Sequence, residues 1–183
     1  MCIRDRVDIW REIADAYELK NDYAQAITAY QKYYDALSQD KKTAESLFQL
    51  GRLYYGQGTS SDTLSVRPAD RATALQAADS VFALVARQAP DSYLGDMWRA
   101  RTNSAMDPET TEGLAKPYYE KVAEMLLAKN EPRYNSALIE CYSYLGYYYL
   151  LKSDYPVSKE YWNKILAIDP TNATAKKALD GIK

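Results

Sequence analysis

The segment "YSYLGYYYLLKSDYPVSKEYW", residues 142–162, has the clearest periodic pattern in the chain. Its first half places large and small residues at i, i+3, i+4 and i+7, the spacing of one helical face: Tyr142, Leu145, Gly146 and Tyr149. A polar break at residues 152–154 follows, and a second stripe then runs through Ser158 and Trp162. The pattern therefore predicts two helices joined by a short turn, with a glycine on the apolar face of the first.

Two earlier segments repeat the first half of this pattern. "WREIADAY" carries it from Trp10 with Ala14 at the small position, and "LFQLGRLY" carries it from Leu47 with Gly51. The distance between packed helices depends on the side chains at their contact, so a small residue allows a close approach. We therefore expect Ala14, Gly51 and Gly146 each to face a companion helix, while the larger residues fill the groove around them.

On these residues the chain resembles the tetratricopeptide repeat (TPR), a helix–turn–helix of about 34 residues written W-x2-L-G-x2-Y…A-x3-F…P. Ala26 and Ala78 stand at the small position of the second helix, and Pro90 and Pro170 close their units. The sequence style resembles that of bacterial, Bacteroidetes-like repeat proteins. The resemblance implies an all-α fold, a right-handed superhelical array of antiparallel helix pairs.

The resemblance divides residues 7–182 into a single array of about four units and a C-terminal capping helix. Their bounds are about 7–40, 44–90, 92–130 and 135–170, with the cap at 173–182. The second unit contains an insertion of 15 residues around 56–67, which is expected to form a Gly/Ser/Thr-rich loop. The third unit allows two registers, one through Trp98 and one through Ala100. Residues 1–6, "MCIRDR", are expected to be non-native or disordered, with the natural chain starting further upstream.

Composition argues against most catalytic chemistry. The 183 residues contain no histidine, whereas serine and cysteine nucleophiles and most zinc sites use an imidazole. Two cysteines are too few for a cysteine-only metal cluster. The acidic pairs Asp107/Glu109 and Glu120/Glu124 are expected to be solvated charges, in a turn and on a helix face respectively. We therefore expect a protein that is not an enzyme and that uses no cofactor or metal.

Charge and hydropathy narrow the range of partners. The chain has 23 basic and 25 acidic residues, a net charge of −2 that provides no general attraction to nucleic acid. No apolar run approaches the ~20 residues that cross a bilayer. We expect a protein or peptide partner, no nucleic acid and no transmembrane segment in this chain. The sequence leaves the localisation open, either in the cytoplasm or in the periplasm and envelope. It also leaves the oligomeric state open.

The resemblance implies a non-catalytic protein–protein interaction scaffold or adaptor that holds a peptide or protein segment in the concave groove of the superhelix. In such arrays the first helix of each unit lines the groove, which gives eight candidate residues: Arg11, Phe48, Arg52, Tyr55, Arg99, Arg101, Tyr147 and Leu151. Arginine and tyrosine are enriched at binding hot spots. The aromatic and aliphatic candidates are expected to grip an extended or helical peptide, and Arg52 is expected to meet its carboxylate.

Two alternatives remain open at this point. First, the eight candidate residues are equally consistent with an ordinary solvated surface. Second, the chain is consistent with the C-terminal TPR part of a larger envelope-associated protein whose activity lies upstream. The carboxylate clamp known from this family is disfavoured, because Asp15 stands where its first asparagine belongs.

The repeat pattern predicts different surroundings for each of the three consecutive tyrosines. Tyr149 belongs to the stripe and is expected to pack between helices. Tyr148 is expected to wedge against a neighbouring helix. Tyr147 falls one position after the small glycine, on the side that faces the inner surface in this family.

Overall fold

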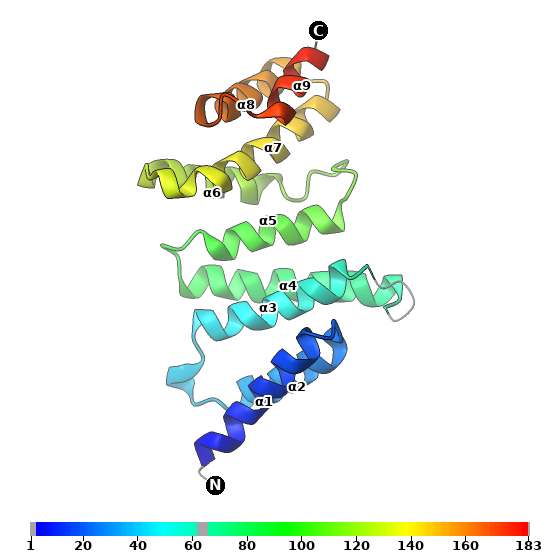
Figure 1. The fold of residues 1–183 in the computed structure, drawn as a ribbon, viewed down its shortest axis with the longest axis vertical. Helices are drawn as coiled ribbons and strands as arrows, with labels where there is room; N and C mark the ends of the chain where they lie inside the picture. The colour runs from blue at the N-terminus through cyan, green and yellow to red at the C-terminus, as the bar shows by residue number, and fades with distance from the viewer. Residues whose placement is uncertain (1–2, 62–65, 183) are drawn as a thin grey trace. The chain divides into compact units, whose positions relative to one another are not determined.

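A computed structural model describes residues 3–61 and 66–182, and every regular element in these ranges is helical (Figure 1). The chain divides into two compact units, one ending at Met106 and one beginning at Asp107. The first unit contains α1 (Ile3–Glu18), α2 (Tyr23–Ala36), the 3₁₀ turn η1 (Gln39–Lys41), α3 (Ala44–Thr59), α4 (Pro68–Gln88) and α5 (Leu94–Met106). The second contains α6 (Lys116–Lys129), the 3₁₀ turn η2 (Pro132–Tyr134), α7 (Asn135–Leu151), α8 (Tyr155–Ile168) and α9 (Ala173–Gly181). The predicted all-α class is confirmed.

Helices that follow one another along the chain pack side by side. In the first unit α1 packs on α2, α3 packs on α4, and α5 lies against α4. In the second unit α6 packs on α7, α7 on α8, and α9 on α8 (Figure 1). Short turns join α1 to α2 and α7 to α8, so these neighbours are antiparallel. This arrangement of adjacent helix pairs is the one that the repeated pattern predicts.

The turns that join α1 to α2 and α7 to α8 have the same sequence pattern and the same geometry. "KNDY" at 20–23 and "KSDY" at 152–155 each place a left-handed residue, Asn21 or Ser153, at φ 58°. The following residue, Asp22 or Asp154, then accepts a hydrogen bond from the backbone N–H three positions on, at 3.2 and 3.4 Å. An aspartate that bonds in this way satisfies an N–H group that has no partner within the helix. The repeat is therefore visible in the capping chemistry as well as in the apolar stripe.

The small stripe residues face their companion helices, as the sequence predicts. A Cβ atom added at Gly51 would lie 2.6 Å from Cε1 of Phe82, and one added at Gly146 would lie 2.7 Å from Cε2 of Trp162. Neither aromatic ring has room to retreat, because Phe82 is 0% and Trp162 is 3% exposed. In the first pair Ala14 takes the same role, buried in one cluster with Ala26.

A polar contact completes the pairing of α7 with α8. The Ser158 hydroxyl donates a hydrogen bond of 2.7 Å to the Gly146 carbonyl oxygen and accepts one of 3.1 Å from Nε1 of Trp162. Ser158 is fully buried, and burying polar groups is tolerated when their hydrogen bonds are made. The sequence singled out these three residues, and the structure places them in one contact.

The three consecutive tyrosines have different surroundings. Tyr149 stacks on Tyr161 of α8, with ring centroids 5.8 Å apart and an angle of 10° between the rings, so it packs between helices as predicted. Tyr148 packs against Gly113 in the loop before α6 and lies under Lys116 in the first turn of that helix. Tyr147 is 43% exposed. One helix therefore uses adjacent tyrosines for a helix contact, a loop contact and an open surface.

Helix α3 continues further than the expected loop allows. The loop was predicted from residue 56, but the helix runs on through Gly56 and Gly58 to Thr59. These glycines lie against the side chains of Tyr23 and Leu75, so they provide close packing rather than a chain break. Residues 62–65 of the predicted loop lie outside the described residues. At the N-terminus α1 begins at Ile3, so residues 3–6 form part of a helix.

Candidate functional site

All eight candidate binding residues lie on the first helix of a pair or on α5. Six belong to the first unit: Arg11 of α1, Phe48, Arg52 and Tyr55 of α3, and Arg99 and Arg101 of α5. The other two, Tyr147 and Leu151, belong to α7 of the second unit. The candidates form four local arrangements, each within one unit.

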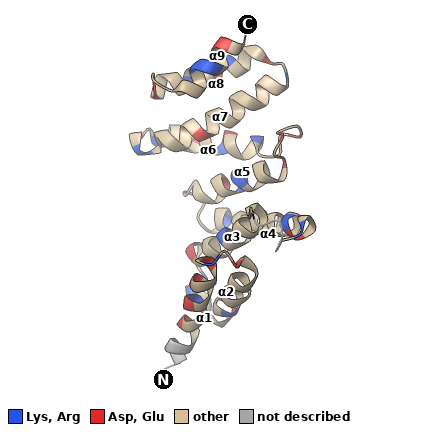
Figure 2. Cartoon of the chain, turned by 45° about the vertical axis from the view of Figure 1, so that its right-hand side comes forward, with Lys and Arg blue, Asp and Glu red and all other residues tan. Residues whose placement is uncertain are grey.

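The first arrangement is a polar hollow of about 480 Å³ between α1 and α3, here called the α1–α3 hollow. Three basic and three acidic side chains line it: Arg11, Lys41, Arg52, Asp15, Glu18 and Glu45. Basic and acidic residues are likewise interspersed along the helices seen in Figure 2. A hollow with both signs of charge suits a ligand that carries both, such as a peptide with mixed charged side chains.

Arg52 already has partners within the α1–α3 hollow. Its Nη2 lies 3.3 Å from Oε1 of Glu18, and its Nη1 donates to Oε1 of Gln49 at 3.3 Å. The Arg52 and Glu18 side chains are 41% and 32% exposed, so the ion pair is open to solvent and contributes little to stability. A ligand carboxylate at Arg52 would therefore join or displace Glu18.

The back of the same hollow is fixed by tyrosines of α2. The Tyr30 hydroxyl donates to the Ser46 carbonyl oxygen at 3.1 Å, which ties α2 to α3, and burial raises the pKa of Tyr30. The Arg11 guanidinium lies over the Tyr33 ring, 5.9 Å from its centroid. A cation over a ring face is attracted by the ring quadrupole, so Arg11 is held at the rim of the hollow.

The second arrangement is an aromatic cluster centred on Trp98 of α5. The rings of Phe48, Tyr55 and Phe82 have their centroids 5.6, 5.2 and 5.4 Å from that of Trp98. Arg101 lies over the Trp98 ring at 5.1 Å. Two predicted groove residues, Phe48 and Tyr55, thus pack edge-on against the indole and are half-buried. The structure brings three of the candidates together here, around a tryptophan that sequence reasoning did not select.

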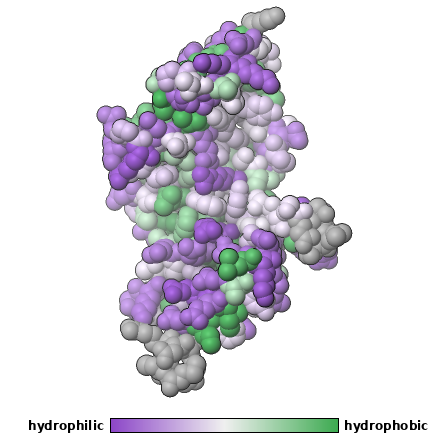
Figure 3. Space-filling model, in the orientation of Figure 1, coloured by the Kyte–Doolittle hydropathy of each residue, from purple (hydrophilic) through white to green (hydrophobic). Residues whose placement is uncertain are grey.

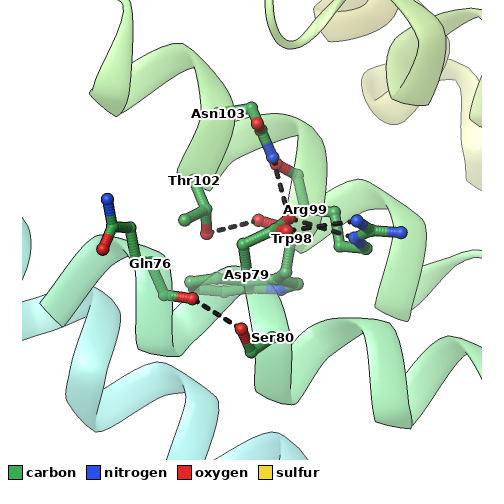
Figure 4. Close-up of polar contacts among 7 residues, drawn as sticks. All are labelled: Gln76, Asp79, Ser80, Trp98, Arg99, Thr102 and Asn103. Carbon is green, nitrogen blue, oxygen red and sulfur yellow. Dashed lines mark hydrogen bonds and ion pairs between the residues drawn. The ribbon is translucent and has the colours of Figure 1, made fainter. Parts of the chain in front are cut away.

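The third arrangement is an ion pair between α4 and α5. Nε and Nη2 of Arg99 contact the two carboxylate oxygens of Asp79 at 3.0 and 3.1 Å (Figure 4). Nδ2 of Asn103 donates to Asp79 at 2.8 Å. A two-pronged contact of this kind is among the stronger charged hydrogen bonds. Arg99 therefore ties α5 to α4 through a side chain that is only 22% exposed.

The fourth arrangement is an apolar groove of about 420 Å³ in the second unit, here called the α7–α9 groove. Tyr147 and Leu150 line it from α7, and Lys177, Ala178, Gly181 and Ile182 line it from the C-terminal segment. Leu151, 44% exposed, follows on the same helix. The sequence predicts that α9 caps the last helix pair. The apolar stripe of α9 is the sequence feature that indicates an apolar surface here. The residues come from segments far apart in sequence, so periodicity alone did not join them.

The acidic pairs considered in the sequence show one departure from expectation. Asp107 is not a solvated charge, because it is 5% exposed and accepts hydrogen bonds from four backbone amides of the loop before α6, at 2.7–3.4 Å. Burial raises its pKa, but these amides lower it more, so the net shift is downward. Glu109 and Glu124 are exposed, and Glu120 pairs with Lys116 at 2.8 Å. These contacts give Asp107 a structural role in shaping a loop.

The described residues also bear on metal binding and on membrane spanning. Within residues 3–61 and 66–182, no group of three or more acidic or cysteine side chains is placed to hold a metal ion. Over the same ranges, no helix is both long enough and apolar enough to cross a membrane. The hydropathy surface in Figure 3 shows hydrophilic residues over most of the face in view, with separate apolar patches between them.

The adjacent helix pairs with small residues at their contacts define a helical-repeat fold of the TPR type. Among solved structures, this chain is similar to the C-terminal part of a TPR repeat-containing protein from Cytophaga hutchinsonii. That structure has a TM-score of 0.80 and 33% sequence identity, over 97% of this chain and 61% of its own. The chain thus spans about three fifths of the length of that relative. No protein-family model matches the chain, and no curated protein does.

The chain therefore resembles bacterial TPR proteins in both sequence pattern and fold. Scaffolds of this kind are helical-repeat modules for interaction with other proteins and are typically non-catalytic.

Proposed function

We propose that this protein is a non-catalytic scaffold that binds a peptide or protein segment along the faces of its first helices. The observation that carries the proposal is the α1–α3 hollow, whose six charged side chains surround about 480 Å³ of open space. Charged and polar groups arranged on a surface select a partner by complementary charge and speed its association. The half-exposed Arg52, together with Arg11 over the Tyr33 ring and Lys41, supplies the positive charge in this hollow.

The other predicted groove residues contribute to binding in two ways in this proposal. Phe48 and Tyr55 present their outer edges beside Trp98, where a ligand side chain can pack on half-buried aromatic rings. Arg101 lies over the same indole, while Arg99 acts through its bond to Asp79 by holding α5 in place. Tyr147 and Leu151 add an apolar contact in the second unit.

The test begins with peptides selected from a displayed random library on the whole chain. Arg11→Gln combined with Arg52→Gln should weaken a selected peptide by at least roughly tenfold, the loss expected when a hydrogen bond to a charged group is removed. Arg87→Gln, an exposed arginine in the last turn of α4, is the matched control and should leave the affinity unchanged. Equal losses in both variants, or no loss in either, would contradict the proposal.

The alternative proposal is that the chain is the C-terminal TPR part of a larger envelope-associated protein. It is supported by the description of the Cytophaga hutchinsonii relative as the C-terminal part of a TPR protein, of which this chain spans 61%. Amplifying and sequencing the region upstream of the reading frame tests it. A continuous upstream frame encoding a further domain and an export signal would favour the alternative, and an in-frame stop codon just upstream would reject it.

A further inference from the structure

The second unit leaves an apolar groove open between α7 and α9. Tyr147, which lines it, is 43% exposed, and Leu151 beyond it is 44% exposed. Large apolar side chains that stay in contact with water beside a concave surface are typical of an interaction site. The groove holds about 420 Å³, which is within the range of pockets that receive side chains or small ligands.

The charge in this groove has one sign. Among the described residues that line it, Lys177 is the only charged one. A partner that buries apolar side chains here is therefore favoured when it carries a carboxylate beside them. A two-fold contact between two copies of the chain fits the groove poorly, because it would bring two Lys177 side chains into one apolar patch that contains no acid.

The glycine at the end of α9 keeps the groove open without supporting the fold. A Cβ atom added at Gly181 would meet nothing within 4 Å, whereas one added at Gly146 would lie 2.7 Å from Trp162. Gly181 also has no left-handed backbone angle that would require glycine. A large side chain at this position can therefore fill the groove while the packing of α7, α8 and α9 stays intact.

We propose that the α7–α9 groove receives the aliphatic side chains of an acidic peptide segment, with a carboxylate of that segment paired to Lys177. The inference rests on the proposed scaffold function and adds the chemistry of the partner at the C-terminal surface. Tyr147 and Leu150 on one wall and Ala178 and Ile182 on the other provide the apolar contact. Lys177 provides the preference for acidic over basic sequence.

The experiment uses three blocked synthetic peptides and the whole chain labelled with ¹⁵N. The peptides are acetyl-Glu-Glu-Leu-Leu-Glu-Glu-amide, its counterpart with lysine in place of glutamate, and its counterpart with serine in place of leucine. The glutamate–leucine peptide should shift the amide signals of Leu150, Lys177 and Ala178. The lysine peptide should bind roughly two- to fivefold more weakly, and the serine peptide more than about tenfold more weakly.

Two variants test the two parts of the proposal. Gly181→Trp should abolish binding of the glutamate–leucine peptide, with Lys176→Trp, at an exposed position of α9 outside the groove lining, as its control. Lys177→Glu should reverse the preference between the glutamate and lysine peptides, with Lys176→Glu, exposed on the same helix, as its control. Circular dichroism of each variant checks that the helices remain.

Several results would overturn the inference. The inference fails if none of the three peptides shifts the amide signals of the groove residues. It also fails if the glutamate and lysine peptides bind equally well, or if Gly181→Trp binds the glutamate–leucine peptide as tightly as the wild-type chain does. Self-association that Gly181→Trp abolishes would assign the groove to a second copy instead. Failure here is distinct from failure of the scaffold proposal, because that proposal is tested by Arg11 and Arg52 in the first unit with library-selected peptides.

Discussion

Gly51 of α3 lies directly against the ring of Phe82 of α4, so close that a Cβ atom would come within 2.6 Å of Cε1. Phe82 is fully buried among Leu47, Ala78 and Val85, which leaves its ring no space to move away. The close approach of this helix pair thus depends on the missing side chain.

Replacing this glycine by alanine should destabilise the protein despite the better helix propensity of alanine. We expect Gly51→Ala to lower the free energy of unfolding by about 1–3 kcal/mol, because overpacking a filled core forces side chains and backbone to shift. The control is Gly181→Ala, where open space surrounds the new methyl group, and where a gain of up to about 1 kcal/mol is expected. Urea unfolding followed by circular dichroism measures both, and equal effects would contradict the packing argument.

Ser158 should be worth more to stability than its size indicates. Ser158→Ala removes the acceptor of the buried Trp162 indole N–H and the donor to the Gly146 carbonyl oxygen, so we expect a loss of about 1–3 kcal/mol. The matched control is Ser80→Ala, an exposed serine that bonds only within its own helix, to Gln76. Thermal unfolding of the two variants distinguishes them, and a Ser158→Ala protein as stable as the control would show that these bonds contribute nothing.

The ion pair of Arg99 with Asp79 should contribute more than a surface pair of similar length. Asp79→Ala leaves Arg99 without its two-pronged partner and removes one of the two acceptors of Asn103 Nδ2, and we expect a loss of about 1–3 kcal/mol. Asp70→Ala breaks the exposed Arg67–Asp70 pair at 2.8 Å and should destabilise the chain less, because solvent screens this pair. Urea unfolding midpoints of the two variants measure the difference. If both variants lose the same stability, partial burial of the Arg99–Asp79 pair is unimportant.

Asp107 should make stability depend on pH in the acid range. Its pKa in the folded chain lies below the ordinary value of 3.8, so the ionised form favours folding. This stabilisation is complete above the ordinary pKa and is lost as the pH falls through the lower folded-state value. We expect Asp107→Asn to lower the free energy of unfolding by about 1–3 kcal/mol at neutral pH.

The difference between the wild-type chain and Asp107→Asn should shrink as the pH falls from about 5 to about 2. Comparing the two chains over this range removes the contributions of the other carboxyl groups, which both chains share. A difference that stays constant with pH would mean that the charge of Asp107 is not what holds the loop before α6.

The helix pairs were predictable because their signal is local and repeated. The spacing of Tyr142, Leu145, Gly146 and Tyr149 sets a helix face, and the same pattern at Gly51 gives the same contact. The extension of α3 was missed because Gly56 and Gly58 were interpreted as loop residues, whereas each lies against a large side chain. A glycine in a helix can mean a break or a close contact, and only the partner on the neighbouring element distinguishes them.

The helices that carry the candidate residues were predictable, but the surroundings of these residues were not. The periodicity placed Arg52 and Tyr147 on first helices, but it could not show that Arg52 pairs with Glu18 or that Trp98 gathers Phe48 and Tyr55. Those contacts join helices that are separated along the chain. Asp107 was missed for a different reason, since its amide partners, although close in sequence, belong to an irregular loop with no sequence period.

We propose that the first helix of each pair, together with α5, presents the surface that binds another chain. The most direct measurement is amide chemical-shift mapping of the whole ¹⁵N-labelled chain during titration with a library-selected peptide. We predict shifts concentrated on α1, α3, α5 and α7, with Arg11, Arg52 and Tyr147 among the affected residues. Shifts confined to α2, α4 and α8, with those three residues unchanged, would contradict it.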